Sequence, residues 1–169
     1  MSRSLSLIVS LILAVAAGLS TRAAETPRVS GDRRPTAQES PAPAEAAWSV
    51  PDIDKLPNDD WGRTVRYGRD LVVRTAALIG PEVADPAHRF AGNNLNCQSC
   101  HLAAGTKAFG LPLVGVYADF PSYRARSGSV GTVEDRIQGC MLRSMNGKPL
   151  PADGREMTAI VAYLKFLSS

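Results

Sequence analysis

The sequence predicts a small all-α domain after a non-globular N-terminal part. Three segments have apolar residues at helical spacing, and the strand pattern of alternating apolar and polar residues is not sustained anywhere. The domain, residues 48–169, has about 120 residues, which can build one hydrophobic core but not two. No internal repeat divides it. We therefore expect one helical domain.

The first predicted helix runs from Asp59 to Ile79, with Asn58 as N-cap candidate and Gly80-Pro81 as its stop. Gly68 lies on its apolar stripe, where a missing side chain lets another helix backbone approach closely, at a cost of about 1 kcal/mol relative to alanine. We expect the last helix to cross there. The stripe consists of Val65, Val72, Ala76 and Ile79.

Two further helices are predicted after a Gly- and Pro-rich segment that we expect to be irregular loop. The middle helix begins after Thr132, which forms a capping box with Asp135, and closes at Asn146-Gly147. The last helix runs from Asp153 to Phe166. One face of the middle helix carries Val133, Ile137, Cys140 and Ser144, flanked by Arg136 and Arg143, and the buried face of the last carries Met157, Ile160, Val161 and Leu164.

The N-terminal part has two compositions, and neither predicts a packed domain. Residues 1–23 begin with Arg3, continue through an apolar run and end in small residues, the pattern of a secretory signal peptide. Residues 24–47 are rich in Ala, Pro, Glu and Arg, so we expect a flexible linker. The signal predicts a periplasmic protein, and its apolar run is short for a spanning helix, so we expect no stable membrane insertion.

The charge of the chain excludes one class of partner. Removing Arg3 and Arg22 with the signal lowers the count of basic residues from 19 to 17, against 16 acidic residues. The mature chain is then almost neutral, and we expect no nucleic-acid partner.

Residues 97–101 form a CxxCH motif, which in an exported chain predicts one covalently bound haem c. Cys97 and Cys100 would add to the haem vinyl groups, and His101 would ligate the iron. A zinc site would need a second Cys/His pair, and a thioredoxin-like disulfide would need βαβ surroundings; the sequence shows neither. The motif and the helices together predict a small class I cytochrome c-like domain.

The other face of the iron has two leading candidate ligands. Met145 is favoured because electron-transfer cytochromes use a thioether there. Cys140 is favoured because it is the cysteine left over in an oxidising compartment, and neighbouring guanidiniums would favour its thiolate. Further candidates are Met141, Met157 and His88. The residues alone do not separate Cys140 from a methionine.

Four stretches, LNCQSCHLAAGT, YRARSG, EDRIQGCMLRSMNGKPLP and MTAIVAYLKFLS, closely resemble the catalytic haem domain of bacterial thiosulfate dehydrogenases. The resemblance covers about residues 59–169. It implies His101 and Cys140 as the axial ligands, with Met145 as alternative distal ligand. It also implies that Arg126, Arg136 and Ser144 line the substrate pocket, although propionate pairing or surface roles are alternatives for each.

The resemblance further implies that the chain couples thiosulfate/tetrathionate interconversion to one-electron transfer, with Cys140 accepting a sulfur fragment. Those dehydrogenases carry two haem domains, whereas this sequence has one CxxCH motif. A separate cytochrome or other redox protein is therefore the expected electron partner. The alternatives are an electron-transfer cytochrome with no substrate of its own and an accessory haem subunit of a sulfur-oxidising complex, so whether the chain is an enzyme stays open at this point.

Overall fold

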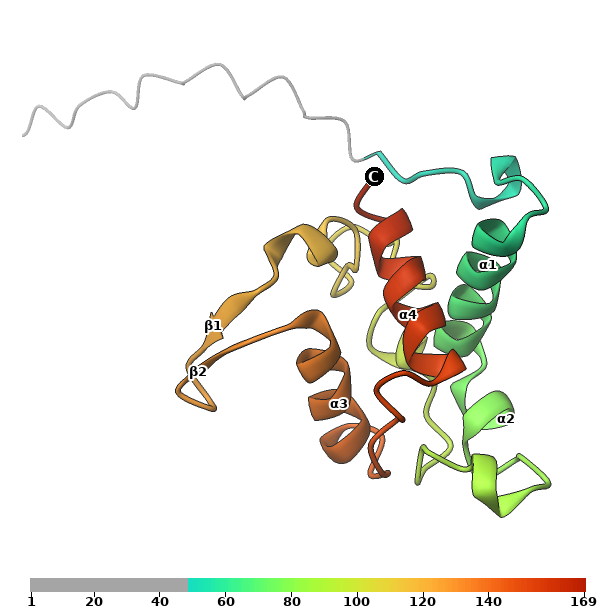
Figure 1. Ribbon diagram of the computed structural model, residues 1–169, viewed down its shortest axis with the longest axis vertical. Coiled ribbons are helices and arrows are strands. Elements are labelled where there is room, and N and C mark those ends of the chain that lie inside the picture. Colours follow the sequence, from blue (N-terminus) through green and yellow to red (C-terminus); the bar gives the residue numbers. More distant parts are fainter. Residues whose placement is uncertain (1–48) are drawn as a thin grey trace, which may run out of the picture. The chain divides into compact units, whose positions relative to one another are not determined.

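The computed structural model describes residues 49–169 (Figure 1). This part of the chain contains four helices and two short strands joined by turns and loops. The predicted signal peptide and linker lie outside these residues. None of the helices in this part is long and apolar enough to cross a membrane. The elements are α1 (Asp60–Val73), α2 (Thr75–Ile79), β1 (Ser122–Arg124), β2 (Ser129–Gly131), α3 (Val133–Arg143) and α4 (Arg155–Phe166), with 3₁₀ turns at Ile53–Lys55, Pro86–His88, Cys97–Ser99 and Val116–Asp119.

The first predicted helix is in fact two helices, because the backbone leaves the helical region at Arg74 (φ −129°, ψ 41°). The Arg74 carbonyl accepts a hydrogen bond from the Leu78 N–H at 3.0 Å and so starts α2. Near the start of α2, the Ala76 N–H donates to Asn96 Oδ1 at 2.9 Å. The apolar periodicity continues through this break, which is why the sequence did not reveal it.

Helix α1 is capped by Asp59, and the expectation for Asn58 was wrong. The Asp59 carboxylate accepts the Gly62 N–H at 2.8 Å, and a negative charge is favourable at the positive end of the helix dipole. Asn58 instead offers its backbone carbonyl to Arg63 Nη1 at 2.7 Å.

Helices α1 and α4 cross in backbone contact at Gly68, as predicted. A Cβ atom on Gly68 would lie 1.9 Å from the carbonyl oxygen of Ala159 and 2.9 Å from Cβ of Tyr163. Figure 1 shows the two helices side by side. The predicted stripe of α1 and α2 is buried in full: Val65, Val72, Ala76 and Ile79 are each at most 3% exposed.

Helix α4 begins at Arg155, two residues later than predicted, and its buried face is wider than the predicted one. Val161, expected in the core, is only half-buried. The face is wider because α4 contributes to two apolar clusters. It gives Ala162, Tyr163 and Phe166 to a cluster with Val65 and Val72, and Met157, Ala159, Ile160 and Leu164 to the larger cluster.

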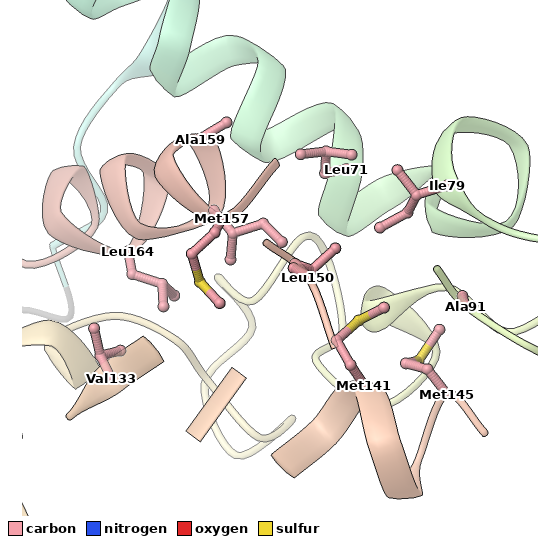
Figure 2. Packing of buried hydrophobic residues seen from close by; sticks show 11 residues of the cluster. Leu71, Ile79, Ala91, Val133, Met141, Met145, Leu150, Met157, Ala159 and Leu164 are labelled. Carbon is pink, nitrogen blue, oxygen red and sulfur yellow. The ribbon is translucent and has the colours of Figure 1, made fainter. Parts of the chain in front are cut away.

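The larger cluster joins side chains of α1, α3 and α4 with those of the loops between them (Figure 2). Met141 and Met145 lie there beside Ala91 and Leu150. Gln138 secures the loop that carries Leu150, because its side-chain amide donates to the Leu150 carbonyl at 2.7 Å and accepts the Leu150 N–H at 2.9 Å. Helix α3 is thereby fixed to the start of α4.

The segment expected to be irregular contains a short antiparallel hairpin, β1–β2, in which Arg124 lies opposite Ser129. The N–H groups of Ser127 and Gly128 donate to the Arg124 carbonyl at 3.1 and 2.9 Å and close the turn. Gly128 has φ +65°, which a side chain would strain. Three-residue strands are too short to show a period of two, so the sequence did not predict them.

The predicted capping box of α3 is confirmed. The Asp135 N–H donates to Thr132 Oγ1 at 3.2 Å, and the Thr132 N–H donates to Asp135 Oδ2 at 2.9 Å. The regular helix ends at Arg143, slightly before the predicted stop, and Asn146 then adopts the left-handed conformation (φ +48°) typical of helix ends.

The contact at Gly68 yields a stability prediction. Gly68→Ala would gain about 1 kcal/mol of helix propensity, but its methyl group would displace α4 from α1, which costs more. We expect the free energy of unfolding to fall by about 3 kcal/mol. Chemical denaturation of the haem-loaded protein measures the change. Gly115→Ala is the control, because its Cβ would meet nothing within 4 Å and only its φ of +80° opposes the change, at about 1 kcal/mol. A stabilising Gly68→Ala would contradict the observed crossing.

Candidate haem site

The CxxCH motif forms one tight turn. The carbonyl of Cys97 accepts the N–H groups of Cys100 at 3.2 Å and His101 at 3.0 Å. The Asn96 N–H donates to Ser99 Oγ at 3.1 Å and closes the start of the turn. Side chains three residues apart lie over one another in a 3₁₀ turn, and Cys97 and Cys100 have this spacing at the turn Cys97–Ser99. No disulfide joins Cys97, Cys100 or Cys140.

Thr75 fixes the first cysteine of the motif. Its side chain is fully buried, and its hydroxyl accepts the Cys97 N–H at 2.9 Å while donating to the Leu71 carbonyl at 2.6 Å. The side-chain amide of Gln98 donates to the Val73 carbonyl at 3.0 Å. The motif is therefore attached to the junction of α1 and α2. The break between these helices exposes the groups that bind the motif, the Thr75 hydroxyl and the Val73 carbonyl.

His101 is oriented by a backbone carbonyl. Its Nδ1 atom lies 2.6 Å from the carbonyl oxygen of Leu111, and because a carbonyl only accepts, Nδ1 carries the hydrogen and Nε2 keeps its lone pair. Metal-bound histidines characteristically have such a second partner. Leu111 adopts φ +51°, which costs a non-glycine residue about 1–2 kcal/mol. This strained residue aims its carbonyl at the imidazole.

These residues fit a covalently bound haem. The turn supplies two thiols three residues apart that form no disulfide, and an imidazole with an available Nε2 lone pair. Apolar side chains close to the motif in sequence are exposed, as a porphyrin needs them to be: Leu95 is 46%, Leu102 39% and Leu111 62% exposed. The donor set is that of haem c rather than of a bare metal ion.

Cys140 lies on α3, half-buried and packed against neither apolar cluster. Burial raises the pKa of the Cys97 thiol; the polar Thr75 hydroxyl, whose oxygen lies 3.4 Å from Cys97 Sγ, opposes this, and the thiols of Cys140 and Cys100 raise the pKa further. Cys140 is therefore within electrostatic reach of the haem motif.

Backbone contacts hold the end of α3 against the segment that precedes the motif. The Gly92 N–H donates to the Met145 carbonyl at 2.8 Å, and Asn93 Nδ2 donates to the Ser144 carbonyl at 3.0 Å. A Cβ on Gly92 would lie 1.9 Å from the carbonyl oxygen of Asn146, so only glycine allows this approach. We call residues 90–93 and 144–148 together the backbone clasp.

The other candidate distal ligands have different surroundings. Met145 is 4% exposed and packs in the larger apolar cluster (Figure 2), as do Met141 and Met157. His88 is exposed, with Nε2 3.6 Å from Asp85 Oδ2. Among these candidates, Cys140 is the one whose sulfur lies outside both apolar clusters.

The predicted pocket residues are brought together in part. Arg136 and Ser144 lie one helical turn before and after Cys140, on the same face of α3. Both are exposed, and no carboxylate of residues 49–169 forms an ion pair with Arg136. Arg126 is exposed in the hairpin turn and makes no hydrogen bond or ion pair with the rest of the site.

Sequence reasoning missed Arg124. It is half-buried in β1, and its side chain reaches α3 by passing two glycines, Gly131 and Gly139. The two glycines leave room for a long side chain and were the feature of the sequence that could have indicated this contact. They indicate it only once the pairing of β1 with β2 is known.

Comparisons with known proteins match this description. The model of the SoxA/TsdA cytochrome c domain family matches residues 88–169. Thiosulfate dehydrogenases are similar to the chain: that of Psychrobacter arcticus is 36% identical over 119 residues, which is 70% of this chain and 34% of the relative. That of Allochromatium vinosum is 36% identical over 130 residues, 75% of this chain and 45% of the relative.

A solved structure has the same fold. Thiosulfate dehydrogenase (TsdBA) from Marichromatium purpuratum superimposes with a TM-score of 0.63 at 30% identity, over 72% of this chain and 26% of that one. The chain thus spans less than half the length of these curated relatives and about a quarter of the solved chain. The described residues form a cytochrome c domain, and such domains carry haem c.

The buried hydroxyl of Thr75 yields a prediction for the haem site. Thr75→Val leaves the Cys97 N–H without its partner, and we expect a loss of about 1–3 kcal/mol of unfolding free energy and less covalently attached haem per chain. Thr75→Ser keeps the hydroxyl and is the control. Denaturation curves and haem-to-protein absorbance ratios measure both effects. Equal values for Val and Ser would show that the hydroxyl does not position the cysteine.

Proposed function

Because residues 88–169 belong to the SoxA/TsdA cytochrome c domain family, we propose that the chain is a periplasmic mono-haem cytochrome that couples thiosulfate/tetrathionate interconversion to one-electron transfer. One observation carries the proposal. The half-buried thiol of Cys140 lies on α3, whose end the backbone clasp holds against the segment before the CxxCH motif, and a guanidinium and a hydroxyl flank it on its own helix face. A periplasmic location rests on the signal-like residues 1–23.

Four residues would hold the haem. Cys97 and Cys100 attach it covalently, and His101 Nε2 and the Cys140 thiolate ligate the iron, with Met145 as the alternative to Cys140. When bound, the haem supplies one-electron redox chemistry. A thiolate ligand stabilises ferric iron and so lowers the potential, whereas a thioether raises it.

The charges at α3 suit a sulfur oxyanion. Thiosulfate is a dianion, and two of them repel each other when they meet to form tetrathionate. Arg136 forms no ion pair with a carboxylate of the described domain, so its guanidinium is free to offset that repulsion. The exposed Ser144 hydroxyl, one turn after Cys140, can donate a hydrogen bond to a sulfonate oxygen.

Cys140 serves in this proposal as the nucleophile. Its thiolate and one thiosulfate form a sulfur–sulfur bond with loss of two electrons, which leaves a Cys–S–S–SO₃⁻ adduct. A second thiosulfate attacks the adduct, forms tetrathionate and releases the thiolate. No proton is taken up or lost. The two electrons pass one at a time to a separate cytochrome or other redox protein.

The role of Cys140 can be tested by substitution in the haem-loaded protein. We expect Cys140→Ala to lower the rate of thiosulfate oxidation at least about 100-fold, because it removes the nucleophile. Cys140→Met is the control, since it restores a sulfur ligand without a thiolate; it should raise the potential and keep electron exchange but not thiosulfate oxidation. Full activity in either variant would refute the proposed role.

The ligation can be tested without turnover. We expect the electron paramagnetic resonance spectrum of the ferric protein to be that of low-spin haem with a histidine and a thiolate ligand, and Met145→Leu to leave it unchanged. A spectrum of histidine–methionine type that Met145→Leu abolishes would assign the distal position to Met145. The chain would then be an electron carrier.

A further inference from the structure

Arg124 extends its side chain from β1 to the middle of α3. A Cβ on Gly131 would lie 2.9 Å from Cδ and 3.5 Å from Nη1 of Arg124, and a Cβ on Gly139 would lie 3.1 Å from its Nη2. The side chain therefore passes over both glycines, and a larger residue at either position would displace it.

A second guanidinium meets it at Gly139. A Cβ there would lie 2.9 Å from Nη2 of Arg143, so the Nη2 atoms of Arg124 and Arg143 approach the same point from two elements. They are at most about 6 Å apart, a separation at which like charges repel. Holding two cations together favours an anion between them.

No carboxylate of the described residues supplies that anion. Neither Arg124 nor Arg143 forms an ion pair with an acidic residue among residues 49–169. Asp135 comes near, since its Oδ2 lies 3.4 Å from the Cβ position of Gly131, but this oxygen accepts the Thr132 N–H in the capping box.

The meeting point adjoins the reactive thiol, because Gly139 directly precedes Cys140. At 100° per residue, Arg143 lies about 60° from Cys140 around the helix on one side and Ser144 about 40° on the other. Gly139, where the two guanidiniums meet, and Arg143 therefore lie on one side of Cys140 around the helix, and Ser144 lies on the other.

We propose that Arg124 and Arg143 form an oxyanion clamp over Gly139 that binds the sulfonate group of thiosulfate beside Cys140. This rests on the proposed function and assigns to it two arginines that neither the family resemblance nor the comparisons single out. Planar guanidiniums donate two parallel hydrogen bonds to paired oxygens, so two of them can hold a sulfonate firmly. The carboxylate of a haem propionate has the same chemistry, and the experiment separates these two sources of oxyanion.

The test compares haem-loaded Arg124→Gln and Arg143→Gln with the wild-type protein at fixed ionic strength. Thiosulfate binding to the ferrous protein is measured by titration calorimetry, and KM, kcat and the haem midpoint potential are measured beside it. We expect each variant to weaken thiosulfate binding about 10-fold or more and to raise KM similarly, with the potential and the haem content unchanged. Arg124→Lys should keep only part of the wild-type affinity, because lysine has the positive charge but not the planar pair of N–H donors of a guanidinium.

Arg63→Gln is the matched control. It removes one positive charge from the exposed start of α1, where Arg63 pairs with Asp60, and it should leave affinity and potential unchanged. If Arg124→Gln does not fold, Arg124→Lys and Arg143→Gln still decide the question.

The outcomes separate the clamp from the function on which it rests. A shifted potential with unchanged thiosulfate affinity in the Arg124 and Arg143 variants assigns these guanidiniums to a propionate and overturns the clamp. Wild-type affinity together with an unshifted potential in these variants also overturns it. A wild-type protein that neither binds nor oxidises thiosulfate overturns the proposed function and the clamp together.

Discussion

The backbone clasp between residues 90–93 and 144–148 is the constraint on which the site depends. The CxxCH motif is fastened to α1 and α2, whereas Cys140 belongs to α3, and α3 makes few direct contacts with the α1–α4 pair. Two glycines bring the segments together: a Cβ on Gly92 would lie 1.9 Å from the Asn146 carbonyl oxygen, and a Cβ on Gly147 would lie 2.0 Å from that of Phe90. Without this approach, the motif and the third thiol would belong to separate surfaces.

Local features of the sequence were sufficient to predict where most of the helices lie. The capping residues Thr132 and Asp135, the stop at Gly80 and the close approach at Gly68 each act within one element or across one packing contact, and the structure has all of them. The break at Arg74 was not predictable, because the apolar spacing continues through it while the hydrogen bonds that need it come from residues 96–98. A local sequence pattern does not show hydrogen bonds to residues that are more than 20 positions away.

The candidate site divides in the same way. The motif residues were identifiable from residue type and spacing, and Cys140 was one of a few candidate iron ligands, since few side chains can ligate iron. Two other features could not be predicted from the sequence, because they depend on loop and hairpin geometry. These are the contact of His101 with the Leu111 carbonyl and the extension of the Arg124 side chain to Gly139. The methionines were ambiguous in sequence for a physical reason: a thioether is both a ligand and a good core residue, and only the fold shows that Met141, Met145 and Met157 pack together.

Electrostatics distinguishes a substrate site from a plain electron carrier. Basic and acidic residues are nearly balanced in the chain, 19 against 16, and several acids are used locally: Asp52, Asp59, Asp85 and Asp135 each accept a backbone N–H at the start of a helix or 3₁₀ turn. Among residues 49–169, none of the arginines on α3 or in the β1–β2 hairpin forms an ion pair with an acid. A carrier that only exchanges electrons gains nothing from converging guanidiniums beside a thiol, and their repulsion costs stability. The proposed reaction brings two dianions to one sulfur atom and would need such a charge imbalance there, so the proposal treats the arginines and the thiol as one site.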